Sequence, residues 1–157
     1  AVDHSMKLGE KSPLKVYLCG PRDKILGSLD EAVSDTSVHP DYVINGDRFR
    51  QFLSEGLLEI VDCSQIVEMG ESPSSVVRSK RDSSLAKAFH LVKEGKAGAM
   101  ISAGNSGAVM AYGIALLGRI AHVKRPAILC HFPTGSQEGG TALLDAGALA
   151  SASAIIS

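Results

Sequence analysis

The amino-acid sequence predicts an α/β fold with a mostly parallel sheet. Short, continuous apolar runs alternate along the chain with segments typical of helices. Strands that are apolar throughout are typical of parallel sheets whose two faces are both covered by helices. The 157 residues are enough for one domain with a substantial core, so we expect residues 1–157 to form a single α/β domain.

The first part of the chain predicts two strands, each with a helix beside it. The apolar runs LKVYLCG (14–20) and LLEIVDC (57–63) are the expected strands. The expected helices are 21–33, where Pro21 suits the first turn, and 47–56, which ends in a glycine.

The central part predicts a polar segment with a basic cluster (64–84) and then the clearest helix, 84–98. Ser83 or Asp82 can cap the start of this helix, and Gly95 can end it. One apolar face is formed by residues at positions i, i+3, i+4 and i+7, namely Leu85, Ala88, Phe89 and Val92.

The last part predicts three strands and one helix. AMISAG (99–104) is expected as a buried strand, and 105–120 as a helix buried on more than one side because small residues lie all round it. Residues 127–132 and 141–147 are the other expected strands. The loop between them, 133–140, is flexible by composition and is a candidate cover for a ligand.

The composition excludes several classes of function. A net charge of −1, 4% aromatic residues and no Trp argue against a nucleic-acid-binding protein. Cys19, Cys63 and Cys130 form no C-x-x-C pair, so we expect buried thiols in a reducing compartment and no metal site. No apolar run of the sequence is long enough to span a bilayer.

The turn at residues 104–107 is the first candidate site. Gly104, Asn105, Ser106 and Gly107 follow an expected strand and begin an expected helix, at the sheet edge where open parallel sheets bind ligands. Free N–H groups at the helix start, close approach at the glycines and the two polar side chains all suit phosphate or a carboxylate. The alternative is a plain turn in which Asn105 or Ser106 is the N-cap.

Known catalytic and nucleotide-binding motifs do not fit this turn. Residues 104–108 nearly match G-x-S-x-G, but Ala108 replaces the last glycine. A serine triad of that type needs Asp and then His after the serine, whereas the last histidine, His131, precedes Asp145. The dinucleotide fingerprint and the P-loop are absent from the sequence. We expect Asp145, at the end of a strand, to be a functional carboxylate or a helix cap.

The segment SPSSVVRSKRDSS is the second candidate site. Its basic residues Arg78, Lys80 and Arg81 precede a helix start that bears Ser83 and Ser84. Charge-assisted hydrogen bonds from these groups suit phosphate, and the alternative is a solvated basic loop. Two anion-binding helix starts in one small domain strengthen the phosphate interpretation.

Several motifs together resemble one known family. RSKRDSSL, VKEGKAGAMISAGNSGAVMA, RPA and GGTALLDAGA resemble, in order and spacing, the PlsX family of bacterial phosphate acyltransferases of phospholipid synthesis, over residues 14–148. The family typically has SAGNTGA where this chain has SAGNSGA, and LLDxGAN where Leu149 stands in place of Asn. The Gly-Gly-Asp that follows the opening strand in the family is missing after residues 1–3, so we expect the chain to be incomplete relative to the family.

The resemblance implies both a fold and an activity. The fold is a three-layer α/β/α sandwich with a mostly parallel sheet, like that of phosphotransacetylases, in a homodimer. The activity is transfer of a fatty acyl group from acyl carrier protein to inorganic phosphate, giving acyl phosphate, without a metal or organic cofactor. The location implied is cytoplasmic, peripheral to the inner face of the membrane, with a membrane glycerol-3-phosphate acyltransferase as partner. The alternatives are a phosphate acetyl- or butyryltransferase that uses coenzyme A, and a non-catalytic fragment that binds an anion or a carrier protein.

The same hypothesis gives each candidate residue a role. Acyl transfer to phosphate requires a positioned phosphate and donors for the developing carbonyl charge, but no protein nucleophile. We expect catalytic roles for Asn105, Ser106 and Lys80, and carrier-protein docking by Arg78. Phosphate binding is expected from Ser83, Ser84, Arg81, Gly104, Gly107 and Asp145. The apolar helix that follows is either a wall of the acyl pocket or ordinary core.

Overall fold

The computed structural model describes residues 14–34, 46–123, 126–133 and 140–144. Its parallel sheet consists of β1 (Val16–Gly20) and β2 (Leu58–Asp62), with Gly20 opposite Asp62 at the carboxyl ends. The apolar runs predicted both strands, and the structure confirms them.

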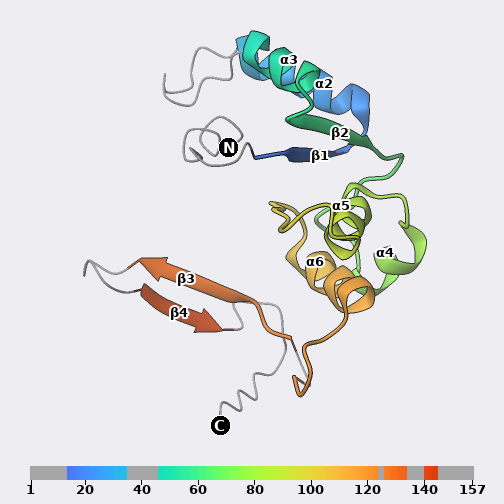
Figure 1. The fold of residues 1–157 in the computed structure, drawn as a ribbon. Coiled ribbons are helices and arrows are strands. Elements are labelled where there is room, and N and C mark those ends of the chain that lie inside the picture. The colour runs from blue at the N-terminus through green and yellow to red at the C-terminus, as the bar shows by residue number, and fades with distance from the viewer. Residues whose placement is uncertain (1–13, 35–45, 124–125, 134–139, 145–157) are drawn as a thin grey trace.

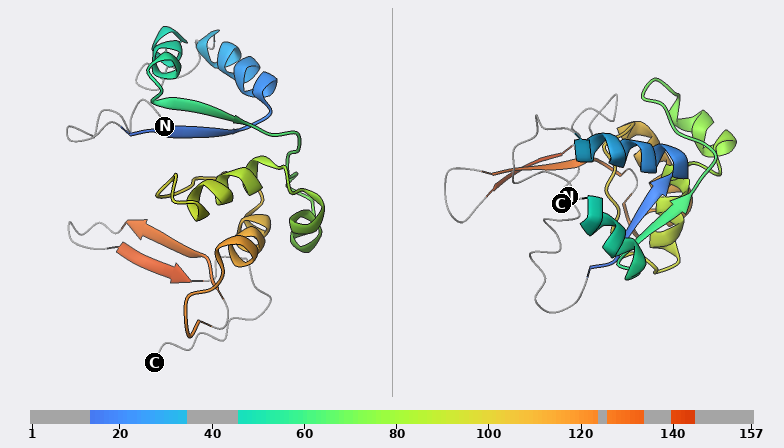
Figure 2. Two further views of the ribbon diagram at one scale, coloured as in Figure 1. Left: turned by 45° about the vertical axis from the view of Figure 1, so that its right-hand side comes forward. Right: turned by 90° about the horizontal axis from the view of Figure 1, so that it is seen from above.

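Helices cover both faces of this sheet and give a three-layer α/β/α order (Figure 1). On one face lie α2 (Arg22–Ser34) and α3 (Gly46–Ser54), and on the other lies α5 (Ser84–Lys93), as the rotated views in Figure 2 also show. The Asp62 carboxylate accepts a 2.9 Å hydrogen bond from the Arg22 N–H and so fixes the start of α2. The predicted α/β fold class is therefore confirmed.

Two further helices pack beside α5. They are α4 (Pro73–Ser79) and α6 (Ser106–Tyr112), and α6 continues as a π-helix, η2 (Gly113–Leu117). The Phe89 and Tyr112 rings stack with their centroids 6.2 Å apart. The main hydrophobic core lies between these helices and consists of Val76, Leu85, Ala86, Phe89, Ala108 and Tyr112.

The other two described strands form a separate antiparallel pair. β3 (Leu129–Pro133) pairs with β4 (Gly140–Leu144), with Leu129 opposite Leu144. In Figures 1 and 2 this pair lies apart from β1 and β2, to one side of α6. Only residues 134–139 separate the two strands, which suits an antiparallel pair because a parallel crossover needs a longer connection. The parallel arrangement expected from the sequence is thus present in β1 and β2 but not in β3 and β4.

The strand expected at 99–104 is wrong. This stretch has no strand conformation, and the Ile101 side chain is 97% exposed. A strand needs a neighbour that pairs with its backbone N–H and C=O groups, and no other described segment pairs with this run. Apolar composition predicts the tendency to form a strand, but it does not supply the neighbour.

The helix expected at 105–120 is shorter and less buried than the sequence predicts. α6 ends at Tyr112 and η2 at Leu117, and Gly118 has a positive φ of 85°, which ends the helical run. Leu117 is 49% exposed and Ile120 is 80% exposed. Burial on more than one side is therefore wrong beyond Tyr112.

The polar segment expected at 64–84 contains a helix, α4, that the sequence pattern did not predict. Pro73 is its first residue, where a fixed φ and a missing N–H cost nothing. Val76 is fully buried in the core and Val77 packs against it, so two apolar residues anchor a short helix in polar sequence.

The described ranges hold neither a membrane-spanning helix nor a metal-binding cluster. No helix there is long and apolar enough to cross a membrane, and no group of His, Cys, Asp and Glu there could hold a metal ion. All three thiols are free. Cys63 is buried, as expected, whereas Cys19 and Cys130 are only half-buried.

Candidate functional site

The Asn105 side chain joins the start of α6 to a distant turn. Its Oδ1 accepts a 3.0 Å hydrogen bond from the Ala108 N–H, which makes Asn105 the N-cap of α6. Its Nδ2 lies 3.2, 3.1 and 3.0 Å from the carbonyl oxygens of Glu68, Met69 and Glu71. The N-cap predicted as the alternative for this turn is therefore confirmed.

These contacts explain why the residue is an asparagine. A side-chain amide has an acceptor on one side and two N–H donors on the other, so it can satisfy a helix N–H and backbone carbonyls at once. An aspartate at this position would turn a second oxygen toward three carbonyls. The Asn105 side chain is thus used within the protein, and it holds the 68–71 turn against the start of α6.

The first backbone N–H groups of α6 have no partner within the helix. The cap bonds the Ala108 N–H, and the Val109 N–H bonds the Asn105 carbonyl. The N–H groups of Ser106 and Gly107 precede these and have no helical carbonyl to bond. Ser106 is exposed, so its hydroxyl can donate at this surface, and Gly107 is half-buried.

Gly107 lies where α6 meets α4. A Cβ on Gly107 would come within 2.8 Å of the Pro73 Cγ and 3.4 Å of the Asn105 Oδ1. A glycine at this position therefore allows the first turns of the two helices to touch. Gly104 has more space, since its nearest neighbour would be the Ser102 Oγ at 3.7 Å.

Lys80 joins the basic segment to the same 68–71 turn. Its ammonium donates to the Ile66 carbonyl and, over 2.6 Å, to the Glu71 Oε2. The Glu71 Oε2 also accepts a 2.8 Å hydrogen bond from the Glu68 N–H. The hydrogen bond from Lys80 and then the Glu68 N–H hold the pKa of Glu71 below its ordinary value. Lys80 and Asn105 therefore meet at one residue, Glu71.

Ser83 is fully buried and its hydroxyl is already bonded. The hydroxyl accepts from the Ala86 N–H at 3.2 Å, which confirms Ser83 as the N-cap of α5. It also lies 3.1 Å from the Tyr112 hydroxyl, which in turn lies 3.0 Å from the Val76 carbonyl and 2.6 Å from the Lys80 carbonyl. This buried group of hydroxyls ties the end of α4 to α5 and α6.

Asp82 fixes the loop that follows β2. Its carboxylate accepts from the Ser64 N–H and hydroxyl at 2.8 and 2.7 Å and pairs with the Lys87 ammonium at 2.8 Å. The Lys87 hydrogen bond, followed by the two from Ser64, holds the pKa of Asp82 far below its ordinary value. The alternative cap at Asp82 is thus not used, because the carboxylate bonds to Ser64 and Lys87 instead.

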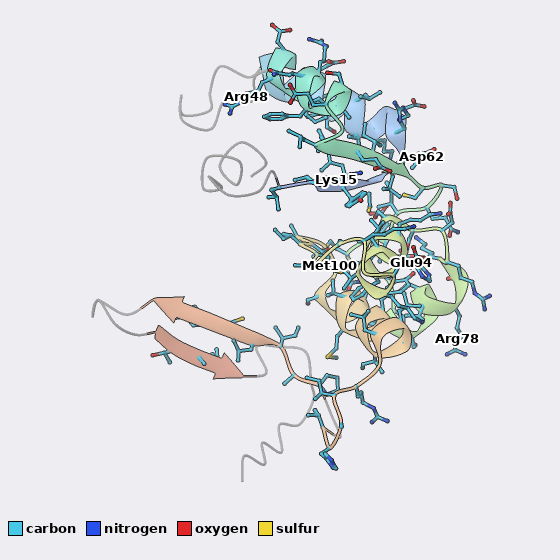
Figure 3. All side chains as sticks on the ribbon, viewed as in Figure 1. Lys15, Arg48, Asp62, Arg78, Glu94 and Met100 are labelled. Carbon is cyan, nitrogen blue, oxygen red and sulfur yellow. The ribbon has the colours of Figure 1, made fainter. Side chains whose placement is uncertain are left out.

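The remaining predicted residues are spread over the surface. Arg81 is exposed and Ser84 is half-exposed beside the start of α5. Arg78 is exposed on α4, its Nε lies 3.3 Å from the Ser74 carbonyl, and Figure 3 shows its side chain directed away from the helices. Asp145 and the loop residues 134–139 lie outside the described residues.

The structure thus brings some of the predicted residues together and separates others. Lys80, Asn105 and the 104–107 turn meet around the 68–71 turn, whereas Ser83 bonds to Tyr112 at the other end of α6. Sequence reasoning missed Glu71 because its contact with Asn105 joins positions 34 residues apart. Gly70 within EMGE was a signal for a tight turn, but not for the partner of that turn.

This layered α/β protein is similar in sequence to known proteins. The model of one family, described as fatty acid synthesis protein, matches residues 5–154. The chain therefore belongs to the fatty acid synthesis protein family.

The chain is also similar to curated proteins named phosphate acyltransferase. It is 55% identical to that of Halothermothrix orenii over 94 residues, which are 60% of this chain and 28% of the relative. It is 40% identical to that of Heliobacterium modesticaldum over 147 residues, which are 94% of this chain and 38% of the relative. It is 39% identical to that of Clostridioides difficile over 135 residues, which are 82% of this chain and 38% of the relative. The chain thus spans between about a quarter and two fifths of the length of these relatives.

Proposed function

We propose that this protein transfers a fatty acyl group from acyl carrier protein to inorganic phosphate and forms acyl phosphate for phospholipid synthesis. Membership of the fatty acid synthesis family and the name phosphate acyltransferase of its relatives support the proposal. The structural observation that supports it most is the start of α6. There the protein itself uses the Asn105 side chain, while the Ser106 and Gly107 N–H groups remain as donors for an anion.

Phosphate binds, on this proposal, to the Ser106 and Gly107 N–H groups and the Ser106 hydroxyl. Gly104 lets the anion approach the turn, and Asn105 holds the turn in shape rather than touching the anion. Lys80 supplies an ammonium N–H, and Arg81 with Ser84 adds charge and a hydroxyl from the basic segment. Ser83 acts from the core as the cap of α5, and Asp145 is a further candidate for phosphate binding.

The reaction needs no protein nucleophile. A phosphate oxygen attacks the thioester carbonyl, the new C–O bond forms and the C–S bond breaks, and the carrier leaves as its thiolate. Fixing phosphate beside the carbonyl converts a bimolecular step into a positioned one. Charge that develops on the carbonyl oxygen needs hydrogen-bond donors as well.

Apolar surface for the acyl chain is available further along the same helical run, beyond the end of α6. Ile114 is 40% exposed and Leu117 is 49% exposed on η2, which continues α6. Exposed Arg78 suits contact with an acidic carrier protein. We further propose a homodimer without metal or organic cofactor. It acts in the cytoplasm at the inner face of the membrane and supplies a membrane glycerol-3-phosphate acyltransferase.

The test is formation of acyl phosphate by the full chain, trapped with hydroxylamine as the hydroxamate. We expect product from acyl carrier protein thioesters and phosphate, and a loss of at least about tenfold in Asn105→Ala with the circular dichroism spectrum unchanged. Full activity of Asn105→Ala would refute the role of the turn.

Two other functions give different results in the same assay. Turnover with acetyl- or butyryl-coenzyme A but not with the carrier thioester would identify the coenzyme A enzyme. Carrier binding by calorimetry without any turnover would identify a non-catalytic module.

A further inference from the structure

Glu71 connects the two parts of the proposed phosphate site through separate atoms. Its carboxylate bonds the Lys80 ammonium at 2.6 Å, and its backbone carbonyl accepts from the Asn105 Nδ2 at 3.0 Å. A second bond from the carboxylate, to the Glu68 N–H at 2.8 Å, fixes the rotamer that reaches Lys80. One residue therefore holds both the cationic group and the side chain that caps α6.

We infer that Glu71 is a positioning residue for phosphate binding, because it fixes the Lys80 ammonium at a set place relative to the start of α6. The inference rests on the proposed function, which makes Lys80 and the 104–107 turn ligands of phosphate. Glu71 itself does not touch phosphate, since a carboxylate repels the anion.

The number of donors on Lys80 agrees with this role. An ammonium has three N–H donors, and the Ile66 carbonyl and Glu71 use two of them, which leaves one for a ligand. The Lys80 side chain is 21% exposed, so the ammonium is held within the fold rather than moving freely in solvent. A lysine fixed in this way loses little further side-chain freedom when phosphate binds.

The two possible roles of Glu71 predict opposite effects of removing its charge on phosphate binding, which makes the test decisive. If Glu71 positions Lys80, its loss weakens phosphate binding. If Glu71 only repels the anion and occupies Lys80, its loss strengthens binding. The two cases differ in sign.

The experiment measures the dissociation constant of inorganic phosphate by calorimetry, together with KM for phosphate and kcat, on the full chain. We expect E71Q and K80Q each to raise the dissociation constant and KM about fivefold, and E71Q to change kcat less than about twofold. The double variant E71Q/K80Q should be no weaker than K80Q, because both changes break one contact. An unchanged or lower dissociation constant in E71Q would overturn the inference.

A reversed pair and a matched control separate positioning from folding. E71K/K80E restores an ion pair but moves the ammonium, so we expect the melting temperature to recover while phosphate binding stays weak. Recovery of phosphate binding as well would overturn the inference in favour of a structural role. E94Q breaks an exposed pair of similar length, Glu94 with Lys96 at 2.8 Å, and should leave phosphate binding unchanged.

The results that would refute the proposed function differ from those that would refute the role of Glu71. Phosphate binding that responds to E71Q as expected, in a protein that forms no acyl phosphate, would refute the acyl transfer and keep the positioning role. Absence of phosphate binding in the unmodified chain would overturn both.

Discussion

Replacing Gly107 with alanine tests the contact that sets the position of α6. The new Cβ would lie 2.8 Å from the Pro73 Cγ, whereas carbon atoms in contact prefer about 3.5 Å or more, so the two helix starts must separate by about 0.7 Å. Pro73 is a rigid ring at the first position of α4 and cannot rotate away. Overpacking of this kind costs about 1–3 kcal/mol. The better helix propensity of alanine returns at most about 1 kcal/mol.

The assay compares thermal unfolding of G107A with that of G27A. Gly27 lies inside α2, and a Cβ at this position would have nothing within 4 Å, so alanine there should stabilise the protein by about 0.5–1 kcal/mol. We expect G107A to lower the melting temperature by about 3 °C and G27A to raise it by about 2 °C. We also expect G107A, but not G27A, to weaken phosphate binding about tenfold, because it displaces the donors of the turn. A G107A protein as stable as G27A, with normal phosphate binding, would refute the reasoning.

Three further predictions concern Asn105, Tyr112 and Asp82. N105D should lower the free energy of unfolding in urea by about 2 kcal/mol or more at neutral pH, because its carboxylate faces three carbonyls. N105D should also be less stable than N105A, and the opposite order of stability would contradict this prediction. Y112F should cost about 1–3 kcal/mol in the same measurement, since two carbonyls lose the one hydroxyl that they share, and no loss would show that these bonds are unimportant. The pKa of Asp82 is lowered in the folded protein, so its contribution to stability is complete above about pH 4 and is lost as the pH falls toward the lower folded pKa. D82N should therefore flatten the fall of unfolding free energy below about pH 4, and an unchanged slope would count against the Lys87 and Ser64 bonds.

Residue types near in sequence, such as capping serines and glycines, predicted the helix ends that depend on them. The start of α5 follows from Ser83, whose hydroxyl caps the helix, and the chain leaves the helix through Gly95, which has a positive φ of 71°. β1 and β2 follow from apolar runs that each found a partner. The run at 99–104 is also apolar but has no described partner, so apolar composition alone could not separate it from a strand.

The candidate site was predictable only in part. A capping asparagine at the start of α6 follows from residue type and position, and the structure confirms it. The contacts that hold Asn105 and Lys80 come from the 68–71 turn, which is distant in sequence and has no motif. Ser83 shows the reverse, since its residue type suited phosphate but its burial reserves the hydroxyl for the fold.

The most direct test of the central claim is a titration of the isotope-labelled full chain with inorganic phosphate, followed through the backbone amide resonances. We expect saturable shifts of the Ser106 and Gly107 amides, with a common dissociation constant, and little change at exposed Gly98. Shifts confined to exposed basic residues such as Arg78, or a Ser106 amide that does not respond to phosphate, would contradict the claim.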